Sequence, residues 1–305
     1  MIHYRMNAQH TAVSPLILGI ATTGRPGILR ATLIHLAGLA DRPDQVIVCI
    51  ADPKDVSEDV LPAMPFSLRV ILSERGTCVQ RNTMLDAVPD AAVLLFIDDD
   101  FMPADGYFSA CRQLFADHPD VVMATGQVLA DGISGPGMDH VEGAAQLAAA
   151  PQLRPAPALS EVYNAYGCNM AVRVATAQAH QVSFDTDLPC YGWLEDVDFS
   201  RRIAPHGRIV KYNAMQGVHL GTKTGRSKGL PLGYSQIANP VYMIRKGSMS
   251  RPRALRMMLR NLLANLAHAW RPEPWVDRRG RLRGNLLALR DLISGQIAPN
   301  RSSGM

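Results

Sequence analysis

Residues 94–103 read LLFIDDDFMP, an apolar run that ends in three consecutive aspartates and then returns to apolar residues. A short run of this kind is typical of a strand buried on both faces of a parallel sheet. The carboxylates of Asp98, Asp99 and Asp100 repel one another at the end of such a strand, where a partly dry environment screens charge poorly. Because a divalent cation offsets this repulsion, the stretch predicts a site for Mn²⁺ or Mg²⁺.

The spacing within the triplet separates its three side chains. In an extended chain Asp98 and Asp100 point to one side and Asp99 points to the other. We therefore expect Asp98 and Asp100 to bind the metal. A solvated acidic turn is the alternative interpretation, and the apolar run directly before the triplet argues against it.

Similar apolar runs recur through the first part of the chain, and the segments between them, such as residues 28–39 and 77–87, have helical spacing. This alternation predicts an α/β fold with a mostly parallel central sheet and helices on both faces. Residues 131–157, rich in Gly, Ala and Pro, are expected to form an ordered excursion or a flexible loop. The expected strands are residues 16–21, 45–51, 67–71, 92–97 and 121–128.

The composition limits the classes of protein to which the chain can belong. Of the 305 residues, 47% are hydrophobic and 19% are charged, which is typical of a globular chain and excludes global disorder. The five cysteines lack the spacing of a zinc knuckle or redox motif. Neither the apolar core of a signal peptide nor a membrane-spanning apolar run is visible. These features predict a cytoplasmic protein with reduced thiols.

Five motifs, in their order, resemble those of glycosyltransferases of the GT-A fold, particularly the bacterial family 2. LLFIDDDFMP is similar to the family's Asp-x-Asp signature, ATTGRPGILRATL to its opening strand end, and SERGTCVQRN to the stretch before the metal strand. YGCNMAVRV resembles its acceptor-side strand, and WLEDVDFSRRI resembles the Glu-Asp-x-Asp start of a helix. Each motif alone is common, and the ordered set, which covers residues 16–247, is the specific feature.

The resemblance implies a metal-dependent inverting transferase that moves one sugar from a nucleotide-diphosphate sugar, with UDP favoured, to a hydroxyl acceptor. A lipid-linked or surface-polysaccharide intermediate is the expected acceptor. The Gln-x-x-Arg-Trp motif of processive members is missing, which indicates a non-processive enzyme. Nucleotidyl transfer to a sugar phosphate is the enzymatic alternative. A nucleic-acid-binding protein would explain the basic C-terminal residues but would leave the acidic clusters without a purpose, so we expect no nucleic-acid partner.

Polar residues at the carboxyl ends of the first strands are expected to bind the donor, because ligands of open α/β sheets lie there. The resemblance implies that Asp52 contacts uracil, and a turn-forming role within ADPKD is the alternative. Arg81, on a helix before the metal strand, is expected to reach phosphate or to pair with Asp98. The full expected donor-binding set is Thr22, Arg25, Asp52, Arg81, Asp98 and Asp99.

A second acidic cluster, Glu195, Asp196 and Asp198, follows Trp193 at the expected start of a helix, where the helix dipole stabilises carboxylates. Capping is the alternative interpretation for one of these acids. The resemblance implies that Asp196 is the general base for the acceptor hydroxyl, with Glu195 as second choice, and a raised pKa would suit that role. Asn169, Trp193 and Asp198 are expected on the acceptor side.

The histidine in GVHLGTKTGR, His219, follows a short apolar stretch. The resemblance implies that it is the third metal ligand, beside Asp98 and Asp100. A lone histidine is more often structural, and this is the alternative interpretation.

From Arg245 onward the chain has 13 lysines and arginines against three acidic residues. We expect a tail over residues 1–14, a catalytic domain over 15–247, and a basic helical extension over 248–305. The catalytic domain would comprise a nucleotide-binding half (15–130) and an acceptor half (160–247). A helix in the extension would place apolar and basic residues on different faces and make peripheral contact with the inner face of the cell membrane. Packing of the apolar face on the catalytic domain is the alternative. The apolar residues are Leu255, Leu259, Leu262 and Leu266, and the basic ones are Arg253, Arg256 and Arg260.

Overall fold

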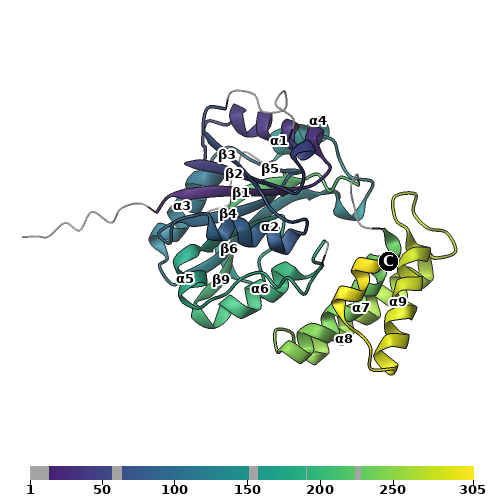
Figure 1. Cartoon of the computed structure of the whole chain (residues 1–305). Coiled ribbons are helices and arrows are strands. Elements are labelled where there is room, and N and C mark those ends of the chain that lie inside the picture. Colours follow the sequence, from purple (N-terminus) through teal and green to yellow (C-terminus); the bar gives the residue numbers. More distant parts are fainter. Residues whose placement is uncertain (1–13, 57–63, 151–156, 190, 224–227) are drawn as a thin grey trace, which may run out of the picture.

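The computed structural model of the protein describes residues 14–56, 64–150, 157–189, 191–223 and 228–305. The expected N-terminal tail lies almost wholly outside these residues. Within them, a single mixed sheet has the strand order β3-β2-β1-β4-β8-β6-β9-β5, with β7 paired to β9 (Figure 1). The strands are β1 (Leu16–Thr22), β2 (Gln45–Ile50), β3 (Ser67–Leu72), β4 (Val93–Asp98), β5 (Phe101–Pro103), β6 (Val121–Asp131), β7 (Leu159–Glu161), β8 (Asn169–Arg173) and β9 (Arg208–His219).

Most of the sheet runs in one direction. The four neighbours β3, β2, β1 and β4 are parallel, and β6 and β9 continue in the same direction beyond the antiparallel β8. The expected mostly parallel sheet is confirmed, and each of the five expected strands is present with ends shifted by a few residues at most. The antiparallel β8 places the acceptor-side motif YGCNMAVRV against the metal strand β4.

Helices cover both faces of the sheet, as expected from the apolar runs on the strands. One core cluster joins one face of the sheet to α1 and α3, and the other joins the opposite face to α2, α5 and α6. The fully buried Leu29, Leu33 and Leu36 recur at helical spacing on α1. The helices are α1 (Pro26–Gly38), α2 (Thr77–Asp86), α3 (Tyr107–Asp117), α4 (His140–Ala149), α5 (Val174–Ala179), α6 (Glu195–Ile203), α7 (Gly229–Lys246), α8 (Arg251–His268) and α9 (Arg278–Ile293).

The excursion after β6 is ordered where it is described. Asp139 caps α4 by accepting a hydrogen bond from the backbone N–H of Glu142, whose carboxylate accepts one in return from the N–H of Asp139. This reciprocal pair satisfies two N–H groups that the first turn of a helix leaves free. Residues 151–156 of the excursion lie outside the described residues.

The helices α7, α8 and α9 pack together beside the sheet (Figure 1). The backbones of α7 and α9 approach closely, since a side-chain carbon at Gly233 would lie 2.0 Å from the carbonyl oxygen of Arg281. At the centre, the buried amides of Asn265 and Asn285 both donate to Gln236. None of the helices in the described ranges combines the length and apolar character needed to cross a bilayer.

Candidate active site and metal centre

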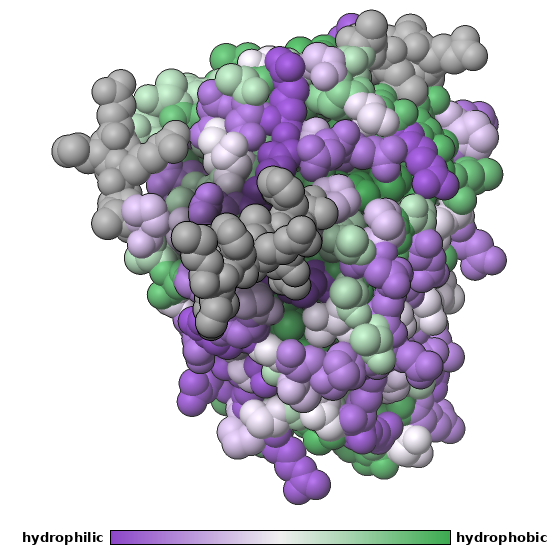
Figure 2. All heavy atoms as spheres, turned by 90° about the vertical axis from the view of Figure 1, so that its left-hand side faces the viewer, coloured by the Kyte–Doolittle hydropathy of each residue, from purple (hydrophilic) through white to green (hydrophobic). Residues whose placement is uncertain are grey.

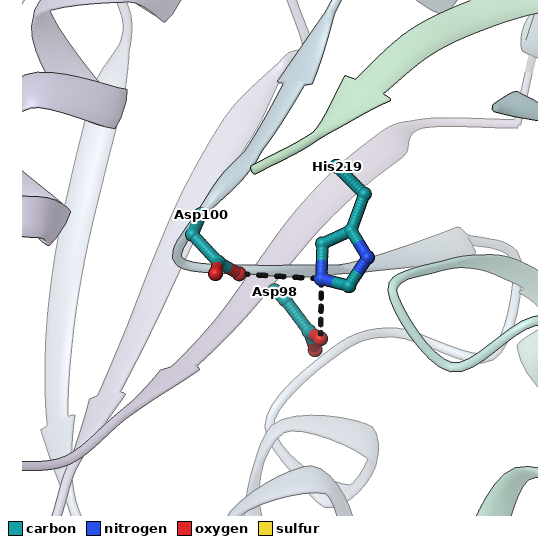
Figure 3. Close-up of side chains that lie close together, drawn as sticks. All are labelled: Asp98, Asp100 and His219. Atoms are coloured by element: carbon teal, nitrogen blue, oxygen red, sulfur yellow. Dashed lines mark ion pairs between the residues drawn. The ribbon is translucent and has the colours of Figure 1, made fainter. Parts of the chain in front are cut away.

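The three expected metal-binding side chains meet at the carboxyl edge of the sheet (Figure 3). Asp98 ends β4, Asp100 lies in the turn into β5, and His219 ends β9. The antiparallel pairing of Phe101 with His219 brings the end of β9 next to the aspartate turn. Nε2 of His219 lies 3.5 Å from Oδ1 of Asp100 and 3.8 Å from Oδ2 of Asp98. One ligand atom from each residue lies within 4.8 Å of the other two.

This donor set fits a divalent cation. Two carboxylates and one imidazole are ligands that Mn²⁺ accepts, while water and phosphate oxygens can complete its coordination. Burial lowers the pKa of His219, but hydrogen bonds to Asp100 and Asp131 and the negative charge of Asp100 and Asp98 outweigh this effect and raise it to about 10. The raised pKa favours a protonated imidazole beside the carboxylates, and a bound divalent ion would take the place of its Nε2 proton.

Asp131 contacts the other side of the imidazole ring. Its Oδ1 lies 2.9 Å from Nδ1 of His219, and its Oδ2 accepts a hydrogen bond of 3.0 Å from the hydroxyl of Tyr166. A carboxylate on Nδ1 keeps that nitrogen protonated and leaves Nε2 free to bind a metal. Sequence reasoning missed Asp131, because it sits at the start of a segment that reads as a loop. The signal that could have identified Asp131 as a site residue is its place at the carboxyl end of a strand.

Asp99, the middle residue of the triplet, points away from the metal ligands. Thr22 Oγ1 donates to its Oδ2 at 2.6 Å, and Nη2 of Arg25 lies 2.5 Å from its Oδ1. Burial raises the pKa of Asp99 to about 7, although the charge of Arg25 opposes this rise. Thr22 and Arg25, both expected to bind the donor, therefore meet at Asp99. Arg25 also lies 3.9 Å from Asp100, which brings positive charge beside the metal cluster.

The structure places Asp52 in a turn. Its exposed side chain accepts a hydrogen bond from the backbone N–H of Lys54 and caps a short 3₁₀ turn, Pro53–Asp55. The neighbouring Asp55 is buried and accepts hydrogen bonds from the backbone of Gly24, Ala51 and Asp52. These contacts fix the end of β2 against the end of β1. The exposed carboxylate of Asp52 lies at the same edge of the sheet as the metal cluster.

Arg81 connects the metal cluster to the second acidic cluster. The guanidinium is buried in the interior, where Nη1 lies 2.5 Å from Oε1 of Glu195. Its Nη2 lies 3.4 Å from Oδ1 of Asp98 and 2.9 Å from the carbonyl oxygen of Gly167. Burial, reinforced by the charge of Asp196, raises the pKa of Glu195 to about 8 against the opposing effect of Arg81. The carboxyl group of Glu195 is thus engaged by Arg81 inside the protein.

Asp196 differs from the other two acids at the start of α6. Glu195 and Asp198 are buried, whereas Asp196 keeps part of its side chain exposed. Its Oδ2 accepts a hydrogen bond of 3.0 Å from the backbone N–H of Gly167, which precedes β8. Burial raises the pKa of Asp196, partly offset by this hydrogen bond and by Arg81. A partly exposed carboxylate with a raised pKa has the properties of a general base.

The three expected acceptor-side residues hold elements in place. Asn169 is fully buried, and its Oδ1 accepts hydrogen bonds from Thr125 and the backbone of Gly126 on β6. Asp198 is fully buried and binds Lys246 at 2.7 Å and Ser248 at 2.5 Å. The carbonyl of the half-buried Trp193 accepts from Asn239 on α7. Asn169 holds β8 against β6, and Asp198 holds α6 against the end of α7. Either residue would therefore affect an acceptor indirectly, through the position of these elements.

Neither a protein-family model nor a curated protein matches the sequence. Solved structures match it by fold. A mannosyltransferase from Pyrobaculum calidifontis, in complex with GDP-Man and Mn²⁺, is 15% identical with a TM-score of 0.52, over 96% of this chain and 87% of its own. TarS of S. aureus, in complex with UDP-GlcNAc, is 14% identical with a TM-score of 0.55, over 95% and 83%.

A third match is GalNAc-T7 with UDP, GalNAc and Mn²⁺, which is 12% identical with a TM-score of 0.52. The match covers 78% of this chain and 52% of the chain of GalNAc-T7. At these identities the likeness defines the fold alone. The chain therefore has the GT-A fold of glycosyltransferases, as the ordered motifs predict, while membership of family 2 stays a prediction.

Proposed function

We propose that the protein is a metal-dependent glycosyltransferase that moves one hexose from a nucleotide-diphosphate sugar to a hydroxyl acceptor. One observation carries this proposal: Arg81 joins a cation-binding cluster, Asp98, Asp100 and His219, to a helix start where Asp196 is partly exposed. A cation site and a candidate base at one edge of a GT-A sheet are the parts that sugar transfer requires. The solved structures with the same fold carry GDP-Man, UDP-GlcNAc or UDP, which supports a nucleotide-sugar donor.

The residues have separate roles in this reaction. Asp98, Asp100 and His219 would hold Mn²⁺ or Mg²⁺, which supplies charge neutralisation for the departing nucleoside diphosphate when it is bound. Asp196 takes the proton of the acceptor hydroxyl as its oxygen attacks the anomeric carbon. The bond from that carbon to the diphosphate oxygen breaks on the opposite face, so the product has inverted configuration. The carboxylic acid formed at Asp196 then returns its proton to solvent.

The donor is proposed to lie along the ends of β1, β2 and β4. Asp52 would accept a hydrogen bond from the nucleobase, with a uracil base favoured. Thr22 and Arg25 shape the diphosphate site through Asp99, which they hold away from the metal ligands. Arg81 acts on the donor through Asp98, because its own guanidinium is buried.

The acceptor is proposed to be a lipid-linked or surface-polysaccharide intermediate, reached at the cytoplasmic face of the membrane. Peripheral contact through the basic C-terminal helices would bring the enzyme to such an acceptor. No nucleic acid takes part in this scheme. The supporting observation is that α8, the first helix of the basic extension, packs beside the acceptor half, where Arg253 lies over the ring of Tyr163 and Ala254 shares an apolar cluster with Val197.

A donor panel tests the proposal. The protein is incubated with Mn²⁺ and a set of UDP- and GDP-sugars, and the release of nucleoside diphosphate is measured with and without a chelator. We expect release from one donor, dependent on the metal. Release of pyrophosphate from a nucleoside triphosphate and a sugar phosphate would indicate nucleotidyl transfer instead, and absence of turnover with every donor would contradict the proposal.

A further inference from the structure

The helix α8 carries an apolar surface that no other described part of the chain covers. The apolar side chains of this surface are 53% to 86% exposed and recur every three or four positions, so they share one side of the helix. The opposite side, with Ala254, Met258 and Asn265, is buried against the neighbouring helices and the acceptor half. We call the exposed set the α8 stripe: Leu255, Leu259, Leu263, Leu266 and Trp270.

A basic row runs beside the α8 stripe. Arg253, Arg256 and Arg260 are exposed and follow the same helical spacing, and at 100° per residue they adjoin the stripe on one side. Together with Ser250, Pro252 and Met257 they line a hollow of about 380 Å³. Residues 248–272 contain five arginines and no aspartate or glutamate.

From this pattern we propose that α8 docks the enzyme on an anionic lipid bilayer, with the stripe among the acyl chains and the arginines on headgroup phosphates. An apolar stripe of about 22 Å beside a basic row is what an interfacial helix presents to a membrane. Trp270 lies just beyond the last helical residue, and tryptophan favours the boundary between lipid and water. A second copy of the chain fits less well, because its α8 would bring the same arginines to the contact without acidic partners.

The position of α8 relates this surface to the site. The guanidinium of Arg253 lies 3.5 Å from the ring centre of Tyr163, and Ala254 belongs to the same apolar cluster as Val197 on α6. The docking helix thus shares an apolar cluster with α6, the helix on which the candidate base Asp196 lies. A bilayer on α8 would lie near the acceptor half. The surface on the other side of the molecule differs from the α8 stripe. Figure 2 shows polar side chains spread among apolar ones over that face.

The inference rests on the proposed function only for the reason why the enzyme would bind a membrane. Membrane binding itself can be measured without donor or acceptor. Full-length protein is sedimented with sucrose-loaded vesicles of phosphatidylcholine, with or without phosphatidylglycerol. We expect binding to the phosphatidylglycerol vesicles and little to phosphatidylcholine alone, with binding weakened by added salt. Leu259→Gln with Leu263→Gln, and separately Arg256→Gln with Arg260→Gln, should each lower the partition coefficient about tenfold.

Matched controls change exposed residues on other parts of the molecule. Ile34→Gln with Val141→Gln, and Arg30→Gln with Arg69→Gln, should leave binding unchanged. Failure of the unchanged protein to bind, or equal binding to both vesicles, would overturn the proposal. So would a dimer, measured by light scattering, that the leucine changes convert to a monomer. Vesicle binding by a protein that releases no nucleoside diphosphate would overturn the proposed function while sparing this inference.

Discussion

Oδ1 of Asp131 lies 2.9 Å from Nδ1 of His219, while Nε2 of the same ring faces Asp98 and Asp100. The carboxylate therefore fixes both the orientation and the tautomer of a candidate metal ligand from the side opposite the metal. Tyr166 donates to the second oxygen of Asp131 and holds it in turn. The strength of the metal site thus depends on residues that do not touch the metal.

Asp131→Asn tests this dependence. The neutral amide cannot stabilise the Nδ1 proton as the carboxylate does, so Mn²⁺ affinity should fall about 10- to 100-fold. Titration followed by the electron paramagnetic resonance signal of free Mn²⁺ measures the change. Tyr166→Phe removes only the hydroxyl that supports Asp131 and should have a smaller effect. An unchanged Kd in Asp131→Asn would show that the contact does not serve the metal.

Asp100→Ala should abolish metal-dependent release of nucleoside diphosphate. Asp100 supplies one of two carboxylates to the cluster and also accepts hydrogen bonds from the backbone and hydroxyl of Thr222, which hold it in place. Release of nucleoside diphosphate is measured for the variant and the unchanged protein with the panel of UDP- and GDP-sugars, with and without Mn²⁺. Asp90→Ala, a change at an exposed loop residue, is the matched control and should retain full activity. Full metal-dependent turnover in Asp100→Ala would refute the assignment.

Asp196→Asn should keep donor binding and lose sugar transfer, because the amide cannot take the proton of the acceptor. Donor binding is measured by calorimetry and transfer by product formation. The raised pKa of Asp196 also predicts a pH effect. Its base form is lost on acidification at a higher pH than for an ordinary aspartate, so kcat/KM should fall there and level off at higher pH. Normal transfer by Asp196→Asn would rule out the base role.

Arg81→Met should lower the free energy of unfolding by about 3 to 5 kcal/mol, because it leaves Glu195 buried without its cation. Urea unfolding followed by circular dichroism gives the value. The double change Arg81→Met with Glu195→Gln should recover part of the loss, since the amide needs no counter-charge. Arg30→Met, at an exposed position of α1, is the control. If Arg81→Met lowers the free energy of unfolding no more than Arg30→Met does, the ion pair contributes little to stability.

The sheet could be predicted from the sequence because its parallel strands are buried on both faces. Such strands read as uninterrupted apolar runs, and the shortness of a run such as LLFID favours a strand over a buried helix. The three metal ligands could also be named, two from the alternation of side chains in DDD and one from the family resemblance. Their convergence follows from the β5–β9 pairing, which local patterns do not encode.

Other features depend on tertiary contacts that a single sequence hides. Glu195 and Asp198 look like exposed acids at a helix start, and only the fold shows that Arg81 and Lys246 neutralise them inside the protein. The expected amphipathic helix is present as α8, but Leu262 is partly buried and Leu263 is exposed beside the other three expected leucines. The structure shows small and amide side chains packing inward while Leu255, Leu259 and Leu266 remain exposed.

The register that pairs Phe101 with His219 has a consequence during biosynthesis. A nascent chain that has left the ribosome only as far as β6 would display Asp98 and Asp100 without the imidazole that completes their set. The complete three-residue cluster can form only after β9 has been synthesised and has paired with β5. Pairing of β9, the last strand in the described ranges, is therefore a precondition for the complete cluster.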